Sequence, residues 1–177
     1  MRQARHPGAP LQPRRLSVPA ESGGEYRLTL PPGAELHAGL LEAAGALGVG
    51  QAAVTLLSGS FARFSYLTGQ PDASGARLAT YGAPTRVPAP ATLIGANGLI
   101  GSDAEGRALL HCHCVVVDAA GRIHGGHLAP GACLVGEAGL TLHLLALAGG
   151  GFAVAYDPET NYAIFHPAPQ AAGEATA

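Results

Sequence analysis

Two histidines separated by one residue lie inside an apolar segment, and this segment constrains the fold more than any other part of the chain. The segment reads LLHCHCVVV over residues 109–117, and its histidines are His111 and His113. Such a run favours a β-strand, in which alternate side chains project from the same face. His111 and His113 are therefore predicted to point to the same side of a sheet.

A turn is predicted directly after this strand, where the sequence reads DAAG before Arg122. A three-residue hairpin loop with Gly121 in the left-handed conformation pairs Asp118 with Arg122. This register places His127 directly across from His113. Because directly opposed residues of an antiparallel pair share a face, the hairpin brings a third imidazole to the first two.

The three imidazoles form a candidate metal site made of His111, His113 and His127. Three neutral imidazoles with one open position are a favoured donor set for zinc, so the predicted cofactor is zinc or another divalent transition metal. A loop of two or four residues would move His127 to the opposite face. In the alternative interpretation, the histidines bond to backbone groups or to each other at a subunit contact. The side chains predicted on the opposite face are Cys112, Cys114 and His124.

The domain organisation follows from where apolar and proline-rich segments lie. Hydrophobic residues make up 47% of the 177 residues, which is enough for one sizeable core. Residues 1–22 are rich in Pro, Arg and Gly and are predicted to be a flexible arm. Residues 167–177 are rich in Ala and are predicted to be a disordered tail, which leaves residues 23–166 as a single domain.

One long helix is predicted in a chain that otherwise consists of strands and turns. Pro31 and Pro32 are predicted to open the helix, and Gly48 or Gly50 to end it. Its apolar stripe is Leu36, Leu40, Leu41, Ala44 and Leu47. Besides the hairpin, strands are predicted at 25–30, 52–57, 61–67, 77–81, 91–96, 133–147 (as one strand or two), 152–156 and 162–165, with a glycine-rich loop at 95–106. The predicted fold class is α+β, a mostly antiparallel β-sheet with one long helix.

The charge distribution argues against a nucleic-acid surface on the domain itself. Residues 23–166 carry six arginines and ten acidic residues, a net charge of about −4. A nucleic-acid surface needs clustered cations that displace phosphate counterions. Such a cluster is found only in the arm, at Arg2, Arg5, Arg14 and Arg15. Any DNA binding is therefore expected to depend on the arm.

The cysteines and the hydropathy indicate a cytoplasmic protein without a membrane partner. The sequence has no signal-peptide core and no apolar run near twenty residues. Its three cysteines are an odd number, which does not suit a framework of disulfides. The spacing of Cys112 and Cys114 is too short for an ordinary zinc-binding pair, so these two are predicted to be buried apolar side chains, and Cys133 is the third cysteine.

Glu137 is the candidate catalytic residue. It is an acid inside the apolar stretch LVGEA, residues 134–138. A buried carboxylate is costly without a partner. Glu137 is therefore predicted either to serve the metal, as a ligand or general base, or to pair with an arginine such as Arg63. His143 and His166 are expected to be ordinary strand residues.

Residues 109–128 resemble the signature of the PPC domain family, named for plants and prokaryotes, and the resemblance extends over residues 25–166. The matching residues are His111 and His113, the turn 118–122, and the Gly-Gly-His-Leu sequence of 125–128. The resemblance implies an α+β domain that assembles as a homotrimer, with a fold similar to that of acetolactate decarboxylase, where three histidines hold zinc. Carried over residue by residue, the metal ligands would be His111, His113 and His127.

Three classes of function remain open. In plant relatives the domain follows an AT-hook in DNA-binding proteins, so the resemblance implies a DNA-binding or regulatory protein. The arm here lacks the Arg-Gly-Arg-Pro core of that hook, and residues 90–94 lack the Arg-Phe-Glu start of the plant interaction motif. The alternative is a zinc-dependent enzyme, a lyase or hydrolase acting on a small molecule, which needs a concave pocket beside an open metal position. A structural trimer whose histidines meet at a subunit contact needs neither a pocket nor a positive surface.

Overall fold

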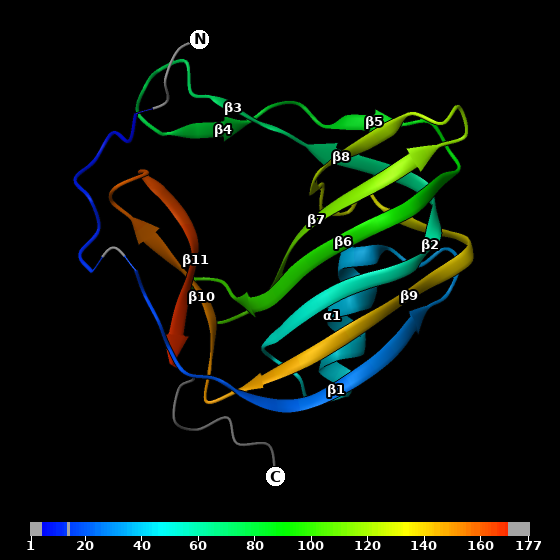
Figure 1. The fold of residues 1–177 in the computed structure, drawn as a ribbon, viewed down its shortest axis with the longest axis horizontal. Helices are drawn as coiled ribbons and strands as arrows, with labels where there is room; N and C mark the ends of the chain where they lie inside the picture. The colour runs from blue at the N-terminus through cyan, green and yellow to red at the C-terminus, as the bar shows by residue number, and fades with distance from the viewer. Residues whose placement is uncertain (1–4, 14, 170–177) are drawn as a thin grey trace.

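The structure is a computed structural model that describes residues 5–13 and 15–169 (Figure 1). Predictions for Arg2, Arg14 and residues 170–177 lie outside this part of the chain. The elements in chain order are β1 (Glu21–Leu30), α1 (Leu36–Ala46), β2 (Ala52–Leu67), β3 (Gly69–Pro71), β4 (Ala79–Tyr81), β5 (Thr85–Val87), β6 (Ala91–Ser102), β7 (Ala108–Asp118), β8 (Ile123–Leu128), β9 (Leu134–Ala148), β10 (Gly150–Asp157) and β11 (Tyr162–Pro169).

Nine of the strands form one large sheet, in the order β1-β9-β2-β8-β7-β6-β10-β11, with β5 paired to β2. The long strand β2 also pairs with β6, so β2, β6, β7 and β8 close on themselves. All pairings are antiparallel except the single residue pair between β6 and β10. Strands β3 and β4 form a separate two-stranded sheet. The predicted fold class, a mostly antiparallel sheet with one long helix, is confirmed.

The helix starts later than the prolines predicted. Pro31 opens a turn, in which the amide of Ala34 donates to the Pro31 carbonyl at 3.2 Å. Glu35 is the N-cap residue, and its carboxylate accepts from the amide of Ala38 at 2.9 Å. This cap satisfies an amide that the first turn of a helix leaves free, so the helix begins at Leu36.

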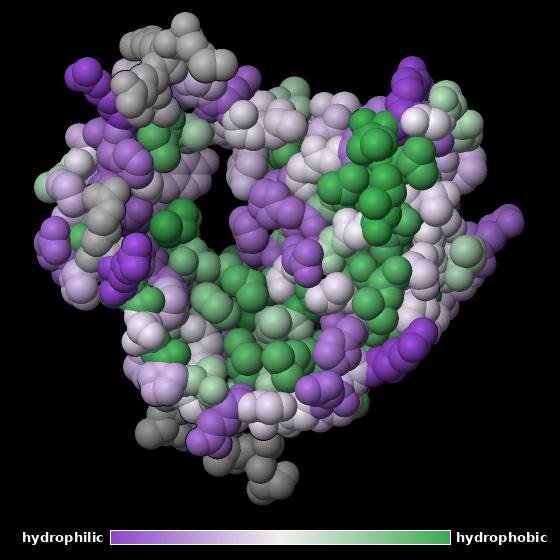
Figure 2. Space-filling model, in the orientation of Figure 1, coloured by the Kyte–Doolittle hydropathy of each residue, from purple (hydrophilic) through white to green (hydrophobic). Residues whose placement is uncertain are grey.

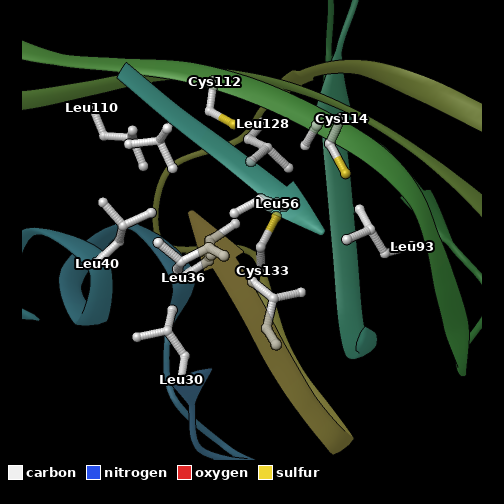
Figure 3. Close-up of a cluster of buried hydrophobic side chains, with 14 of the residues drawn as sticks. Leu30, Leu36, Leu40, Leu56, Leu93, Leu110, Cys112, Cys114, Leu128 and Cys133 are labelled. Carbon is white, nitrogen blue, oxygen red and sulfur yellow. The ribbon is translucent and has the colours of Figure 1, made fainter. Parts of the chain in front are cut away.

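The core lies between α1 and the sheet. Leu36 and Leu40 of the helix are fully buried and face buried side chains of the strands (Figure 3). Burying each such leucine contributes about 1.5–3 kcal/mol. The buried strand and loop residues labelled in Figure 3 are Leu30, Leu56, Leu93, Leu110, Cys112, Cys114, Leu128 and Cys133.

The three cysteines are free and buried, as predicted for Cys112 and Cys114. Burial raises the pKa of Cys112 to about 12 and the pKa of Cys133 to about 11, and it also raises the pKa of Cys114. Thiols with such high pKa values are poor metal ligands and poor nucleophiles near neutral pH. The cysteines therefore belong to the core rather than to a reactive site.

Several strands are longer than the sequence predicts. Strand β6 continues through Gly95 to Ser102, because it pairs with β7 over its length, so the predicted loop at 95–106 is wrong for residues 95–102 and only its end, 103–106, lies in a turn. Strand β2 runs unbroken across Ser58–Ser60 by means of bulges against β9. Strand β11 continues to Pro169, beyond the predicted domain end, because residues 167–169 pair with β10.

The described part of the arm lies against the turn between β10 and β11. The amide of Gly8 donates to the Glu159 carbonyl, and the amide of Leu11 to the Glu159 carboxylate, both at 3.1 Å. Figure 1 shows this blue segment running beside the β10–β11 hairpin. Within the described residues, no helix has the length and apolar character needed to cross a bilayer.

Candidate metal centre

The turn between β7 and β8 has the predicted three-residue loop. The amide of Asp118 donates to the Arg122 carbonyl at 2.9 Å, and the amide of Gly121 donates to the Asp118 carbonyl at 2.9 Å. Gly121 has a φ of 77°, in the left-handed region that favours glycine. The register that follows pairs His113 directly with His127, as predicted.

The carboxylate of Asp118 stabilises this turn through hydrogen bonds. It is buried and accepts hydrogen bonds from the amides of Ala120 and Arg122, at 2.9 and 3.0 Å. It also accepts from Nε of Arg122 at 2.9 Å and lies 3.0 Å from Nε2 of His124. The hydrogen bond with His124, followed by those from Arg122, holds the pKa of Asp118 well below its usual range. The charged carboxylate therefore stabilises the loop length that sets the histidine register.

Replacing Asp118 with asparagine is expected to lower the melting temperature at pH 7. The asparagine side chain keeps one acceptor oxygen, but it loses the second acceptor and the negative charge. The pKa of the acid is lower in the folded than in the unfolded chain. Its stabilisation is therefore complete above the unfolded value of about 3.9 and is lost as the pH falls further. The difference in melting temperature between the two proteins should narrow from pH 7 to pH 3. A constant difference would contradict this role of the charge.

The opposite face of the hairpin is occupied as predicted. Cys112 and Cys114 point into the core, and His124 bonds to Asp118 away from the other histidines. A β-carbon at Gly126 would meet the Leu67 carbonyl oxygen at 2.5 Å, because β2 lies against β8 there. The glycine before His127 therefore lets β8 pack closely between β7 and β2.

The imidazoles of His111, His113 and His127 converge. The ring centroid of His111 lies 5.1 Å from that of His113 and 4.7 Å from that of His127. The centroids of His113 and His127 are 5.4 Å apart. Within the described part of the chain, these three are the group of His, Cys, Asp and Glu side chains that could hold a metal ion. His111 and His127 are half-buried, whereas His113 is exposed.

The surroundings of His111 and His127 favour the neutral form of these two imidazoles. Burial, and then the neighbouring His111, His113 and His37, lower the pKa of His127 to about 4. Burial, and then His113, lower the pKa of His111. A neutral imidazole has a free lone pair on one ring nitrogen, which is the form that binds metal ions.

The three histidines fit a divalent transition metal in donor type and in spacing. A tetrahedral ion about 2.0–2.1 Å from each nitrogen places neighbouring nitrogens about 3.3 Å apart. One potential ligand atom from each histidine lies within 4.8 Å of the others, and the Nε2 atoms of His111 and His113 are 3.1 Å apart. Nδ1 of His127 is buried and has no hydrogen-bond partner in the part of the chain that the structure describes. Small side-chain rotations would therefore bring three nitrogens to one ion.

Two aromatic rings flank the histidine cluster. Tyr81 of β4 stacks on His127, with ring centroids 5.0 Å apart and planes at 22°. Phe165 of β11 meets His111 edge-on, with centroids 6.1 Å apart. Neither contact was predicted, because both residues come from strands far from the hairpin along the chain.

His37 on α1 was also missed, although it interrupts the apolar stripe of the helix. It is buried, and neither ring nitrogen has a hydrogen-bond partner among the described residues. Its Nδ1 lies 3.7 Å from the carboxylate of Glu35, and burial lowers its pKa. A protonated His37 repels positive charge on His127 and lowers the pKa of His127. A residue of α1 therefore helps to keep the His127 imidazole neutral.

Glu137 does not have the buried position predicted for it. Its side chain is exposed and makes no ion pair or hydrogen bond among the described residues. The expected partner Arg63 instead donates from Nη2 to the Gly131 carbonyl at 3.1 Å. A general acid–base role for Glu137 stays a prediction. His143, on β9, lies 3.4 Å from the exposed carboxylate of Glu25, outside the cluster.

Comparisons with known proteins place this fold and hairpin in a family. A sequence profile of the Plants and Prokaryotes Conserved (PCC) domain matches residues 18–142. A metal-containing protein from Archaeoglobus fulgidus is 19% identical, with a TM-score of 0.70, and the match covers 86% of this chain and 99% of that one. A plant- and prokaryote-conserved (PPC) protein from Pyrococcus horikoshii is 18% identical, with a TM-score of 0.69, over 86% of this chain and 97% of that one.

A protein from Bacteroides thetaiotaomicron, named as a DNA-binding candidate, is 15% identical, with a TM-score of 0.66, over 84% of this chain and 96% of that one. At such identities the three structures show a shared fold. No protein with a curated description matches the sequence. The profile match covers more than half of the chain and includes the histidine hairpin. The chain therefore belongs to the Plants and Prokaryotes Conserved (PCC) domain family, the family that its hairpin resembles.

Proposed function

We propose that the protein binds a zinc-type divalent metal through His111, His113 and His127 and uses it on a small molecule. The observation that carries this proposal is the convergence of the three imidazoles on one face of the sheet, where burial lowers the pKa of His111 and His127. Three protein ligands leave a fourth position open, which is the arrangement of catalytic rather than structural zinc sites. A metal held there supplies Lewis-acid polarisation of a ligand oxygen.

The residues around the histidines support this use of the site. Tyr81 and Phe165 cover two of the imidazole rings and limit the access of water from those sides. His113 is exposed and lines a cavity, so a small molecule has a path to the cluster. The chain therefore holds the ligands with packed strands and leaves one side open.

DNA binding or a regulatory role is a second candidate function. One similar structure is named as a DNA-binding candidate, and the family resemblance points the same way. The charge of the domain opposes it, because residues 23–166 carry six arginines against ten acidic residues. Sequence-specific binding in a gel-shift assay by a chain that starts at Ser22 would favour this second function.

We also propose that the chain works as a homotrimer in the cytoplasm. Exposed apolar side chains lie on neighbouring strands of the face that carries the histidines, and Figure 2 shows them gathered where β6 and β7 run. This apolar stripe is Leu57, Ile94, Val115 and Ile123. Contiguous exposed apolar surface marks interaction sites, and a symmetric assembly would bury it. The three free cysteines suit a reducing compartment.

Replacing Ile123 with aspartate is expected to dissociate the trimer. Ile123 is 71% exposed in the single chain, so the charge is tolerated there but is costly in a buried interface. Light scattering should give three times 17.7 kDa for the parent protein and a smaller mass for the variant. Tyr156→Asp, at a 64% exposed residue outside the stripe, is the control and should remain trimeric. A monomeric parent protein at micromolar concentration would contradict the assembly.

Metal analysis tests the proposed function. The purified protein is stripped with a chelator, dialysed against zinc and analysed by plasma mass spectrometry. We expect about one tightly held ion per chain, since the cluster offers one set of three ligands. Zinc that washes out completely under mild dialysis would contradict the proposal.

A further inference from the structure

A cavity of about 350 Å³ opens beside the histidine cluster. It lies between β4 and the β10–β11 hairpin, and Figure 2 shows the molecule hollowed on the side where these elements face the main sheet. Its volume is in the range of cavities that hold small ligands. The lining residues that matter here are Leu78, Tyr81, His113, Tyr162 and Ile164.

The walls of this cavity carry no formal charge. None of its lining residues is Asp, Glu, Lys or Arg, and apart from His113 they are aliphatic, phenolic, hydroxyl or glycine residues. A charged group placed against such walls would lose its hydration without gaining a partner. A charged head group is therefore accepted only at the end of the cavity where His113 belongs to the histidine cluster.

Two tyrosine rings, those of Tyr81 and Tyr162, form part of the uncharged cavity walls and give them flat surfaces. Tyr81 stacks on His127 and also lines the cavity, so its ring lies next to both the cluster and the ligand space. Tyr162 lines the same space, and the guanidinium of Arg77 lies 5.1 Å from the centre of its ring. Flat aromatic walls favour a planar or unbranched apolar body over a bulky polar one.

We propose that this cavity binds small molecules that have one anionic oxygen head group and an uncharged, apolar or aromatic body. The head group reaches the metal at the histidines, and the body lies between Tyr81, Tyr162 and Ile164. The inference rests on the proposed function for the head group, whereas the fit of the body rests on the cavity alone. Nucleotides and other molecules with several charges are excluded by the same uncharged walls.

Cobalt(II) is a suitable probe, because it replaces zinc in histidine sites and its visible absorption changes when a ligand binds. The cobalt-loaded protein is titrated with acetohydroxamate, benzohydroxamate and 4-carboxybenzohydroxamate, which share one metal-binding group. Benzohydroxamate is expected to bind at least about tenfold more tightly than acetohydroxamate, since its ring fills apolar space. 4-Carboxybenzohydroxamate is expected to bind at least about tenfold more weakly than benzohydroxamate, since its carboxylate meets uncharged walls. Equal affinities for the three compounds would overturn the proposal.

Ile164→Trp tests whether the cavity is the source of this preference. Ile164 is 40% exposed, so the larger ring can be accommodated while it fills the ligand space. The variant should bind acetohydroxamate like the parent protein and lose the preference for benzohydroxamate. Leu47→Trp is the matched control, because Leu47 is 39% exposed at the end of α1, away from the cavity, and should keep the preference. An unchanged preference in Ile164→Trp would overturn the proposal.

A second arm separates this inference from the proposed function. If cobalt does not bind, the proposed metal function fails, and the cavity is tested in the metal-free protein with benzyl alcohol. Its addition should shift the methyl NMR signals of Ile164 and Leu78 and leave those of Leu47 unchanged. No shift, or equal shifts at all three residues, would overturn the proposed cavity.

Discussion

Replacing His127 with alanine is expected to reduce the bound metal from about one ion per chain to less than about a tenth of that under the same dialysis. The variant keeps only two ligands, both on β7, and loses the one that β8 supplies. Changes in residues that merely support a ligand already weaken metal binding about 10- to 100-fold, so loss of a ligand should have a larger effect. Plasma mass spectrometry gives the metal content.

His143→Ala is the matched control for this change. His143 also lies on a strand of the large sheet, but its ring nitrogen faces Glu25 rather than the cluster. The control variant should keep the full metal content of the parent protein. Equal metal loss in both variants would show that metal binding to this protein is not specific to the cluster.

Inserting one alanine between Ala119 and Ala120 is expected to abolish metal binding and to lower the melting temperature. If the hairpin keeps its favoured three-residue loop, the insertion shifts the pairing of β8 with β7 by one residue and moves His127 to the opposite face of β8. The same shift would turn Leu128, which is fully buried, out of the core. Metal analysis and a thermal melt followed by circular dichroism measure the two effects.

An insertion between Gly75 and Ala76 is the control, because this exposed loop between β3 and β4 does not set the register of β7 and β8. It should leave the metal content unchanged. If the insertion between Ala119 and Ala120 left the full metal content in place, the account of the hairpin register would be wrong.

The histidine hairpin was predictable because every determinant is local. The alternation of residues 109–117, the turn residues and Gly121 lie within about twenty consecutive residues, and local turn chemistry fixes the register. Burial of Cys112 and Cys114 followed from the same alternation. These predictions needed no knowledge of the rest of the fold.

The environment of the site was not predictable, because it depends on strands distant in the sequence. Tyr81 and Phe165 reach the histidines only once β4 and β11 are placed beside the hairpin. Glu137 escapes burial through the bulged register of β9 against β2, where Val135 pairs with Phe61 and Leu140 with Gly59. The apolar neighbours of Glu137 predicted burial, but the unpaired residues between these two pairs turn its side chain to the outside.

X-ray absorption at the zinc edge tests the central claim most directly. The zinc-loaded protein is measured in solution, alongside His127→Ala. Three histidine ligands predict a first shell of nitrogen and oxygen at about 2.0–2.1 Å, with the outer-shell scattering of imidazole rings, and loss of this signal in the variant. A shell of sulfur at about 2.3 Å would assign the metal to cysteines and contradict the claim, as would an imidazole signal that survives in His127→Ala.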